Sequence, residues 1–382
     1  MHLIEDPLES FGDDELKYWL ALAQCTTGYN LWNFFEKFNS LKPFWLASRD
    51  ELIMIGKTEK LGLEWLTPPV VDKILKKKSA VDPDELLAAL HETNATAYAM
   101  AHPFYPAMLR HCNDPPAILY HIGGMPLSEL EPSIGVVGTR HPSLYGQKHA
   151  KAFALELAAS GMTVVSGMAL GVDSLAHWGA IEAGGRTVAV VAGGPDHCYP
   201  SSNRPLYKKL TETKQGCVIS EFFPGIKPDQ WHFPARNRII AGMTKGLLVI
   251  EAGEKSGSLI TGGQAFDYGR NVYAIPGKID SPQSVGTHRL ISDTKAKLVT
   301  NVQMILTDLG IAGHTRAKEA PRAIELFGRE REVYDLIGDE PVHFDHLADT
   351  TGMSVGELSS TLTILELAGV VERLTGDAYI KA

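Results

Sequence analysis

The first ninety residues show the hydrophobic spacing of short amphipathic helices. Apolar side chains recur every three or four residues around Trp19 and Leu20, and again around Leu31 and Phe34. This spacing gathers them on one face of a helix, and the prolines and glycines in between separate one helix from the next. We therefore predict an all-helical domain of the SAM or helix-hairpin-helix kind over residues 1–90.

Beyond a proline-rich connector at residues 102–124, short apolar runs alternate with amphipathic stretches. The runs are mostly β-branched and nearly continuous, as is typical of parallel strands buried on both faces. This alternation predicts an α/β domain over residues 91–310, with a Rossmann-like, doubly wound and mostly parallel sheet. The predicted strands are residues 134–137, 163–165, 187–191, 217–220, 247–250, 272–275 and 297–299, and the predicted helices include residues 147–159, 174–183, 203–213 and 263–268.

The end of the chain follows a different order. Three amphipathic stretches precede two strand-like segments that meet near Gly376. This order is typical of a winged helix-turn-helix, which we predict over residues 322–382, after a linker at residues 311–321. The three helical stretches are residues 330–337, 344–350 and 355–368, and the strand-like segments are residues 369–374 and 377–380.

The net charge of −9 is unevenly distributed along the chain. Residues 134–310 hold 18 Lys and Arg against 13 Asp and Glu, a surplus of +5. Residues 1–133 have a net charge of −8 and residues 320–382 have −7. Segment differences of this size also arise as ordinary scatter. If a polyanion binds this chain, however, we expect it to bind the middle segment.

The chain shows no features of an exported or membrane protein. No run of about 18 apolar residues is present, and the acidic N-terminus does not resemble a secretory signal. The four cysteines are far apart and form no CxxC pair, which favours free thiols over a disulfide framework or a zinc site. We expect a cytoplasmic protein that needs neither a metal nor a cofactor.

The first predicted strand runs into Gly138, Thr139 and Arg140. A glycine at a strand-to-helix turn lets backbone N–H groups approach an anion, and Arg140 can add a bidentate phosphate contact. The segment lacks the GxGxxG pattern, and the second strand ends at Ser166 instead of the acid that a dinucleotide ribose requires. We therefore predict a phosphate site and no NAD or FAD site. The alternative is a plain tight turn with a surface arginine.

Two further glycine turns follow predicted strands. Ser166 and Gly167 end the second strand, and we expect Asp173 to cap the helix that follows. After the fifth strand, small hydroxyl residues flank a glycine, a composition that favours a nest of backbone donors for an anion. The alternative for this second turn is a helix cap supplied by Ser258 or Thr261. Its residues are Lys255, Ser256, Gly257 and Ser258.

A cluster of aromatic and basic residues lies in a predicted loop between the fourth and fifth strands. Phe233 is followed closely by Arg236, Asn237 and Arg238. Aromatic rings can stack on bases while arginines follow a backbone, which is how single strands are held without sequence readout. Alternatively, the aromatics are core and the arginines form a solvated face. Since Arg236 and Arg238 lie two positions apart on a helix, they point in different directions, and one of them can be structural.

All four turns belong to the carboxyl ends of parallel strands, the edge at which doubly wound sheets bind ligands. This convergence is stronger evidence than any single motif. Catalytic signatures such as HExxH and GxSxG are absent from the sequence. We therefore expect an anion-binding rim that carries out no chemistry.

Together these blocks resemble the DNA-processing protein A family. Residues 135–140 resemble its GxxGxR segment, residues 166–173 its SGxAxGID block, and residues 233–241 its FPxRNRIIA block. Residues 255–261, with Gly269-Arg270 and residues 274–277, are similar to its KSGSLIT…GR…AVPG stretch. The blocks occur in family order over roughly residues 95–300.

The resemblance implies single-stranded DNA binding without catalysis, a homodimer formed through the Rossmann-like domain, and delivery of the strand to RecA recombinase in natural transformation. Many members carry a basic residue where this chain has Leu170, which removes one plausible phosphate contact. The residues implied to bind DNA are Gly138, Thr139, Arg140, Phe233, Arg236, Asn237, Arg238, Lys255, Ser256, Gly257 and Ser258. From the strand order we also expect Ser166 and Gly167 to line the same crevice as Gly138.

Two alternatives concern other functions. The glycine turns also resemble nucleoside-monophosphate phosphoribohydrolases, but these carry a PGGxGTxxE glutamate where this chain has Gln264. A duplex-reading regulator would use the winged helix, but its charge of −7 should repel phosphates. We therefore predict that the winged helix contacts protein.

Overall fold

The computed structural model describes residues 12–311, 326–338, 341–374 and 376–381. Contacts divide the chain into two compact units, Met1–His314 and Thr315–Ala382, which are considered separately below. Most of the predicted linker, residues 312–321, lies outside the described residues. Within the described ranges, no helix has the length and apolar character needed to cross a bilayer.

The predicted helical region is confirmed. Its helices bury Trp19 and Phe34 completely, as their spacing indicated. Both side chains belong to the same hydrophobic cluster as Leu119 of the sheet, so the helices and the sheet share one core. The helices are α1 (Asp13–Ala23), α2 (Gly28–Phe38), α3 (Lys42–Leu46), α4 (Arg49–Gly56), the 3-10 turn η1 (Glu59–Leu61), α5 (Pro68–Lys78) and α6 (Pro83–His91).

The sheet of the large unit has nine strands in the order β1-β2-β6-β5-β4-β3-β7-β8-β9. Strands β3 to β9 pair in parallel, which confirms the predicted Rossmann-like sheet, whereas β1 and β2 pair antiparallel with their neighbours. The strands are β1 (Thr96–Ala99), β2 (Ile118–Gly123), β3 (Ser133–Val137), β4 (Thr163–Ser166), β5 (Thr187–Val190), β6 (Gly216–Ser220), β7 (Gly246–Val249), β8 (Asn271–Ala274) and β9 (Lys297–Leu298).

The connector predicted at residues 102–124 was wrong in its second half, because it contains β2. Pro115 and Pro116 made this stretch resemble a loop. In the structure they precede the strand, where the missing N–H groups cost no ladder hydrogen bonds. Strand β1 was also missed, because it is only four residues long and half alanine.

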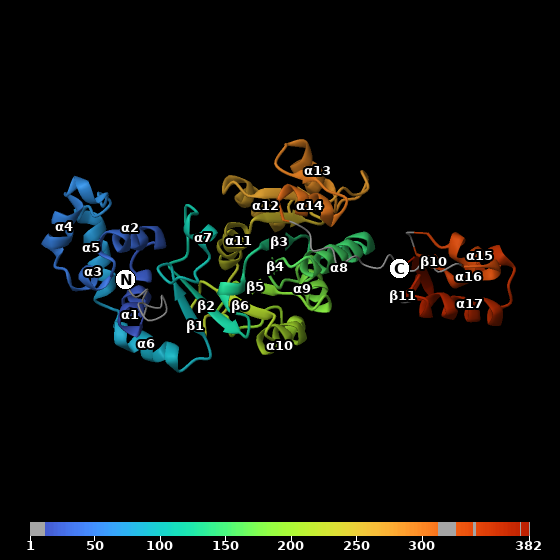
Figure 1. The fold of residues 1–382 in the computed structure, drawn as a ribbon, viewed down its shortest axis with the longest axis horizontal. Helices are drawn as coiled ribbons and strands as arrows, with labels where there is room; N and C mark the ends of the chain where they lie inside the picture. The colour runs from blue at the N-terminus through green and yellow to red at the C-terminus, as the bar shows by residue number, and fades with distance from the viewer. Residues whose placement is uncertain (1–11, 312–325, 339–340, 375, 382) are drawn as a thin grey trace, which may run out of the picture. The chain divides into compact units, whose positions relative to one another are not determined.

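Helices cover both faces of the sheet (Figure 1). Helices α8, α9 and α14 pack on one face, and α11, α12 and α13 pack on the other. The bounds are α7 (Ala107–Arg110), η2 (Leu127–Glu129), α8 (Leu144–Ala159), α9 (Val172–Glu182), η3 (Ser201–Asn203), α10 (Arg204–Glu212), α11 (His232–Met243), α12 (Gly257–Asp267), α13 (Val285–Ser292) and α14 (Val302–Asp308).

Three predictions about these helices were wrong. Phe233 and its neighbours lie in α11 and not in a loop, because Pro234 falls in the first turn, where proline is tolerated. Helix α12 begins at Gly257, six residues before the predicted start, since its glycines weaken the helical pattern. Helix α9 is capped by Gly171, whose φ of 76° favours glycine, and Asp173 lies inside the first turn.

The small unit has the predicted winged-helix order. Its core contains Leu347, Leu358, Leu362 and Tyr379, all nearly inaccessible to solvent. The three strands pair in the order β10-β12-β11. The elements are α15 (Gly328–Leu336), β10 (Val342–His343), α16 (Phe344–Thr351), α17 (Val355–Leu367), β11 (Val371–Leu374) and β12 (Ala378–Lys381).

A completely buried histidine on α9 makes the stability of the large unit sensitive to acid. Nδ1 of His177 lies 2.7 Å from Oγ1 of Thr187, and this hydroxyl donates its proton to the carbonyl of Val164. Nδ1 is therefore the donor, and the neutral ring leaves Nε2 unprotonated and without a partner. Burial, together with the charge of Arg236, lowers the pKa of His177 from 6.5 to about 3.

We expect the unfolding free energy to fall as the pH decreases from 6.5 toward 3. The unfolded chain binds a proton at this histidine in that range and the folded chain does not, which gives a slope of up to about 1.4 kcal/mol per pH unit. Urea denaturation at pH 7 and pH 4.5 checks this against His177→Leu, which should lose less stability between the two pH values. An equal loss in both proteins would contradict the assignment.

Candidate functional site

A groove lies where β3 and β7 end side by side. The strand order reverses at this pair, and ligands of doubly wound sheets bind at such a switch point. The groove has a volume of about 470 Å³. Its lining includes the loop after β3, the first turns of α11, and the segment that leads from β7 into α12. The predicted residues that line it are Gly138, Thr139, Arg140, Phe233, Arg236, Asn237, Lys255, Ser256, Gly257 and Ser258.

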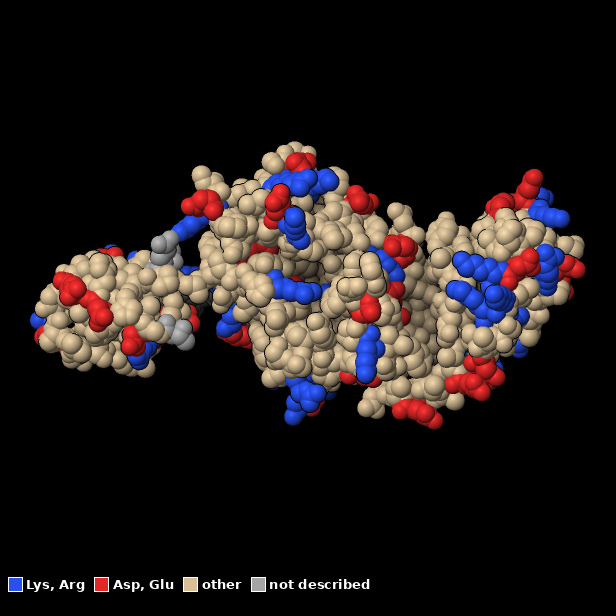
Figure 2. All heavy atoms as spheres, turned by 180° about the vertical axis from the view of Figure 1, so that it is seen from behind, with Lys and Arg blue, Asp and Glu red and all other residues tan. Residues whose placement is uncertain are grey.

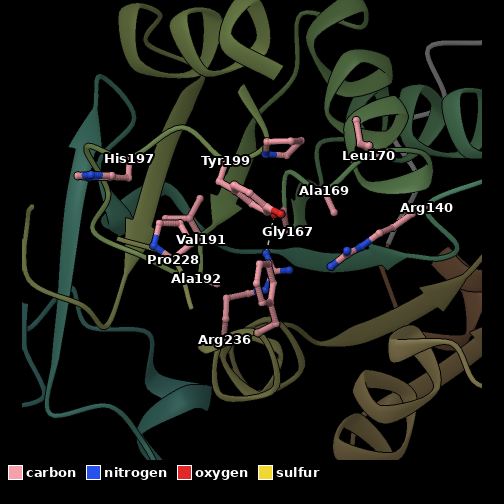
Figure 3. Close-up of a pocket in the computed structure, with 12 residues that line it drawn as sticks. Arg140, Gly167, Ala169, Leu170, Val191, Ala192, His197, Tyr199, Pro228 and Arg236 are labelled. Atoms are coloured by element: carbon pink, nitrogen blue, oxygen red, sulfur yellow. Dashed lines mark hydrogen bonds between the residues drawn. The ribbon is translucent and has the colours of Figure 1, made fainter. Parts of the chain in front are cut away.

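A second, smaller pocket of about 50 Å³ adjoins the groove and shares Arg140, Phe233 and Arg236 with it. Figure 3 shows Arg140 extending from its loop toward Arg236, with Tyr199 and Leu170 on the other sides of the pocket. The walls of this pocket are largely apolar, with the aromatic rings of Tyr199 and Phe233 among them. The two hollows together place cationic and aromatic groups next to each other.

Arg140 is exposed and held by contacts on both sides. Its guanidinium lies 5.4 Å from the centre of the Phe233 ring, within the range of a cation–π interaction. The backbone beside it is fixed, because the N–H of Thr139 donates to the carbonyl of Glu251 at 2.8 Å. The N–H of Val172 donates to the carbonyl of Thr139 at 3.2 Å. Arg140 therefore offers its N–H groups to the groove without a large ordering cost.

Arg236, in contrast, is a buried structural residue. Only 5% of it is exposed, and its Nη1 donates to the carbonyls of Gly167 and Val190, each at 2.5 Å. Its charge also lowers the pKa of Asp173, against the larger effect of burial, which raises that pKa. A Cβ atom at Gly167 would overlap the guanidinium, which explains the glycine. Arg236 thus ties the ends of β4 and β5 together beneath the groove.

Two predicted residues do not line either hollow. Ser166 is completely buried, and its hydroxyl donates to the carbonyl of Val136 at 2.6 Å. Arg238 lies on another side of α11, where its guanidinium is bound by Glu221 and Asp114. Both positions are structural, and Arg238 differs from Arg236 in direction, as their spacing of two residues required.

The start of α12 is the open side of the groove. Ser256 caps the helix by accepting from the N–H of Ser258, and Lys255 is exposed beside it. Space around Gly257 is free, since a Cβ atom there would meet nothing within 4 Å. The partial positive charge of the helix terminus and the ammonium of Lys255 favour an anion here. Ser256 is therefore the cap, in place of Ser258 or Thr261.

The sequence did not single out Tyr199, an exposed residue of the smaller pocket. Its ring centre lies 5.8 Å from that of Phe233, so the two form an aromatic pair at the pocket wall. Eight residues separate Tyr199 from the end of β5, and this distance along the chain gave no sign that Tyr199 returns to the same edge of the sheet. An aromatic residue in a long loop after a parallel strand was the available signal.

We expect Arg236→Met to lower the unfolding free energy by about 3 kcal/mol or more, because it leaves two carbonyls without donors and a buried Asp173 without its nearby cation. Thermal and urea unfolding measure the loss. Arg289→Ala is the control, because this arginine is exposed and forms an ion pair with Asp293 one turn away. Equal stability of Arg236→Met and the unsubstituted protein would contradict the structural role.

Comparison with known proteins agrees with this arrangement. A family model described as DNA recombination-mediator protein A matches residues 96–310, and a DprA winged helix domain model matches residues 316–377. The DNA processing protein DprA of Bacillus subtilis is 40% identical over 59% of this chain and 74% of its own length.

Two solved structures share the fold. DNA processing protein A of Streptococcus pneumoniae has a TM-score of 0.64 and 32% identity, over 78% of this chain and 98% of that one. DNA processing protein A of Helicobacter pylori, described for its single-stranded DNA binding mode, has a TM-score of 0.51 and 27% identity, over 58% of this chain and 97% of that one. The chain belongs to the DNA recombination-mediator protein A (DprA) family of DNA-processing proteins.

Proposed function

We propose that this protein binds single-stranded DNA in the groove between the ends of β3 and β7. The observation that supports it most is the convergence of Arg140 and the open start of α12 on one hollow, with Phe233 and Tyr199 beside them. Phosphates would bind to Arg140, Lys255 and the α12 amides, and bases would contact the rings. The single-stranded DNA bound by the Helicobacter pylori relative supports the same ligand.

A single strand suits this combination better than a duplex does. In a duplex the faces of the bases are stacked inside, whereas a single strand exposes both its phosphates and the faces of its bases. Aromatic stacking tolerates any base, and backbone amides do not discriminate between sequences. Binding should therefore depend little on sequence and strongly on salt.

We propose that the protein acts on DNA by binding alone. Two carboxylates line the groove, but Asp173 is buried beside Arg236, and Glu254 is exposed at the rim. In the phosphoribohydrolase alternative, the position of the expected glutamate is Gln264, which follows the first two turns of α12 and does not line the groove. The geometry therefore gives that alternative no support.

We further propose that the bound strand is delivered to RecA recombinase and that the protein works as a homodimer through its Rossmann-like domain. Both proposals rest on membership of the family. Leu170 lies at the smaller pocket, 41% exposed, where many relatives carry a basic residue. The phosphate contact missing there leaves Arg140 and Lys255 as the main cations of the site.

For the winged helix we propose contact with protein. Its residues 320–382 have a net charge of −7, and α17, at the position of a recognition helix, contains no Lys or Arg. Figure 2 shows acidic side chains over the face of this unit, at the left of that view. Phosphate neutralisation, which supplies most non-specific affinity for DNA, is therefore weak here.

Arg140→Ala and Lys255→Ala should each weaken binding of a twenty-residue oligothymidine by about 1–3 kcal/mol, the loss of one charge-assisted phosphate contact. Fluorescence anisotropy at several salt concentrations measures it. Each phosphate neutralised contributes a slope of about −0.7 in log K against log salt, so each variant should lose about that much. Lys208→Ala, on α10 outside the groove, is the control. Salt-independent affinity, or tighter binding of duplex, would contradict the proposal.

Removing residues 320–382 should leave oligothymidine affinity within about twofold, because the deleted segment carries few phosphate-binding cations. The same anisotropy assay compares the shortened protein with the full chain. A collapse of DNA affinity on deletion would show that the winged helix binds the strand itself.

A further inference from the structure

Helices α8, α9 and α12 follow β3, β4 and β7 and begin at the carboxyl edge of the sheet. Each helix start has unpaired N–H groups and a partial positive charge, so each attracts an anion. At α12 the space is open, as described above. At α9 the first turn holds the buried carboxylate of Asp173, which accepts from the N–H of Ala169 at 3.4 Å. At α8 the anion is again one of the protein's own side chains.

That side chain is Glu251, at the end of β7. Its Oε2 accepts from the N–H of Ser143 at 2.9 Å, and its Oε1 accepts from the Ser143 hydroxyl at 2.5 Å. Ser143 is the cap of α8 and accepts in turn from the N–H of Gly146 at 3.1 Å. The carboxylate therefore sits where an external phosphate would bind in a nucleotide-binding fold.

The surroundings of Glu251 are shaped around the carboxylate. A Cβ atom on Gly146 would overlap it, so only glycine at this position lets the carboxylate reach the helix start. Glu251 is 2% exposed, and no Lys or Arg of the described residues forms an ion pair with it. The Ser143 donors and the helix dipole thus replace a cation as its compensation.

Glu251 also holds the loop that carries Arg140. Its backbone carbonyl accepts from Thr139 and its carboxylate binds Ser143, so the residues on both sides of Arg140 are attached to the end of one strand. We propose that Glu251 is a built-in anion that positions the Arg140 loop for the DNA backbone and closes the start of α8 to external phosphates.

This positioning role rests on the proposed function, since Arg140 matters as a ligand of the strand. With Glu251 at the start of α8 and Asp173 in the first turn of α9, the start of α12 is the one of these three termini that remains open to the phosphates of DNA. The arrangement accounts for a Rossmann-like fold that lacks the usual nucleotide site, because the place for a nucleotide's phosphates is already filled from within.

The test uses the full-length protein, with formate as a small carboxylate and chloride at equal ionic strength as the reference. Glu251→Ala should lower the melting temperature by several degrees and weaken oligothymidine binding on the order of tenfold, since one charge-assisted contact is lost. Formate should restore part of the melting temperature and part of the oligothymidine affinity, because it can occupy the start of α8 that the substitution leaves empty. Glu251→Gln keeps the shape of the side chain and still fills the site. Formate should therefore change the melting temperature and the DNA affinity of this variant no more than it changes those of the unsubstituted protein.

Gly146→Ala provides a second route if Glu251→Ala folds poorly. Its methyl group should displace the carboxylate and weaken DNA binding, and formate should not rescue it because the site is blocked. The double variant Gly146→Ala with Glu251→Ala should melt higher than Gly146→Ala alone, since the overlap is gone. Glu129→Ala removes an exposed carboxylate from η2 and is the control for loss of charge.

A purely structural Glu251 would show a lower melting temperature with no response to formate, and that outcome would overturn the proposal. If Glu251→Ala bound DNA with unchanged affinity, the proposal that Glu251 positions Arg140 would also be overturned. The melting arm contains no DNA. If the unsubstituted protein fails to bind oligothymidine while formate still restores Glu251→Ala, the proposed function fails and the built-in anion stands.

Discussion

The groove depends on a guanidinium that is almost completely buried. Where parallel strands end, their last carbonyl groups lack partners on a neighbouring strand, and a buried site cannot leave them unpaired. Arg236 binds two of these carbonyls, at Gly167 and Val190, and its charge is compensated electrostatically by Asp173. The loops above it are then free to present exposed groups such as Arg140, because the chain beneath them is already fixed.

The parts of the fold that follow from long, regular patterns could be predicted from the sequence. All seven parallel strands were found because most of them are nearly continuous apolar runs, and the winged helix because its helices keep their periodicity. Strand β2 and helix α11 were missed because Pro115, Pro116 and Pro234 suggested loops. In the folded chain these prolines lie just before the strand or in the first turn of the helix. Such residues are tolerated at the starts of elements, and a sequence alone does not show where an element starts.

The sequence predicted where the candidate site lies, at the carboxyl edge of the sheet, but not which role each of its side chains has. The strand order and the glycine turns bring the loops together, and this placement does not depend on how the side chains are oriented. Whether an arginine can bind a ligand or instead stabilises the fold depends on how deeply it is buried. The sequence does not show this, because nothing in it distinguishes Arg140 from Arg236 and Arg238. Glu251 was visible after β7, but its partner Ser143 lies 108 residues away, so only the folded chain reveals their contact.

The core shared by the helical region and the sheet has a consequence for how the protein can be divided. Gly28 of α2 lies so close to the carbonyl of Pro115 that a side chain would not fit between them, and Trp19 and Leu119 belong to one apolar cluster. A shortened protein that begins near residue 95 would expose this cluster to water and tend to aggregate. The first ninety residues are then part of the folding unit of the sheet, and a loss of DNA binding on their removal would say nothing about whether they touch DNA.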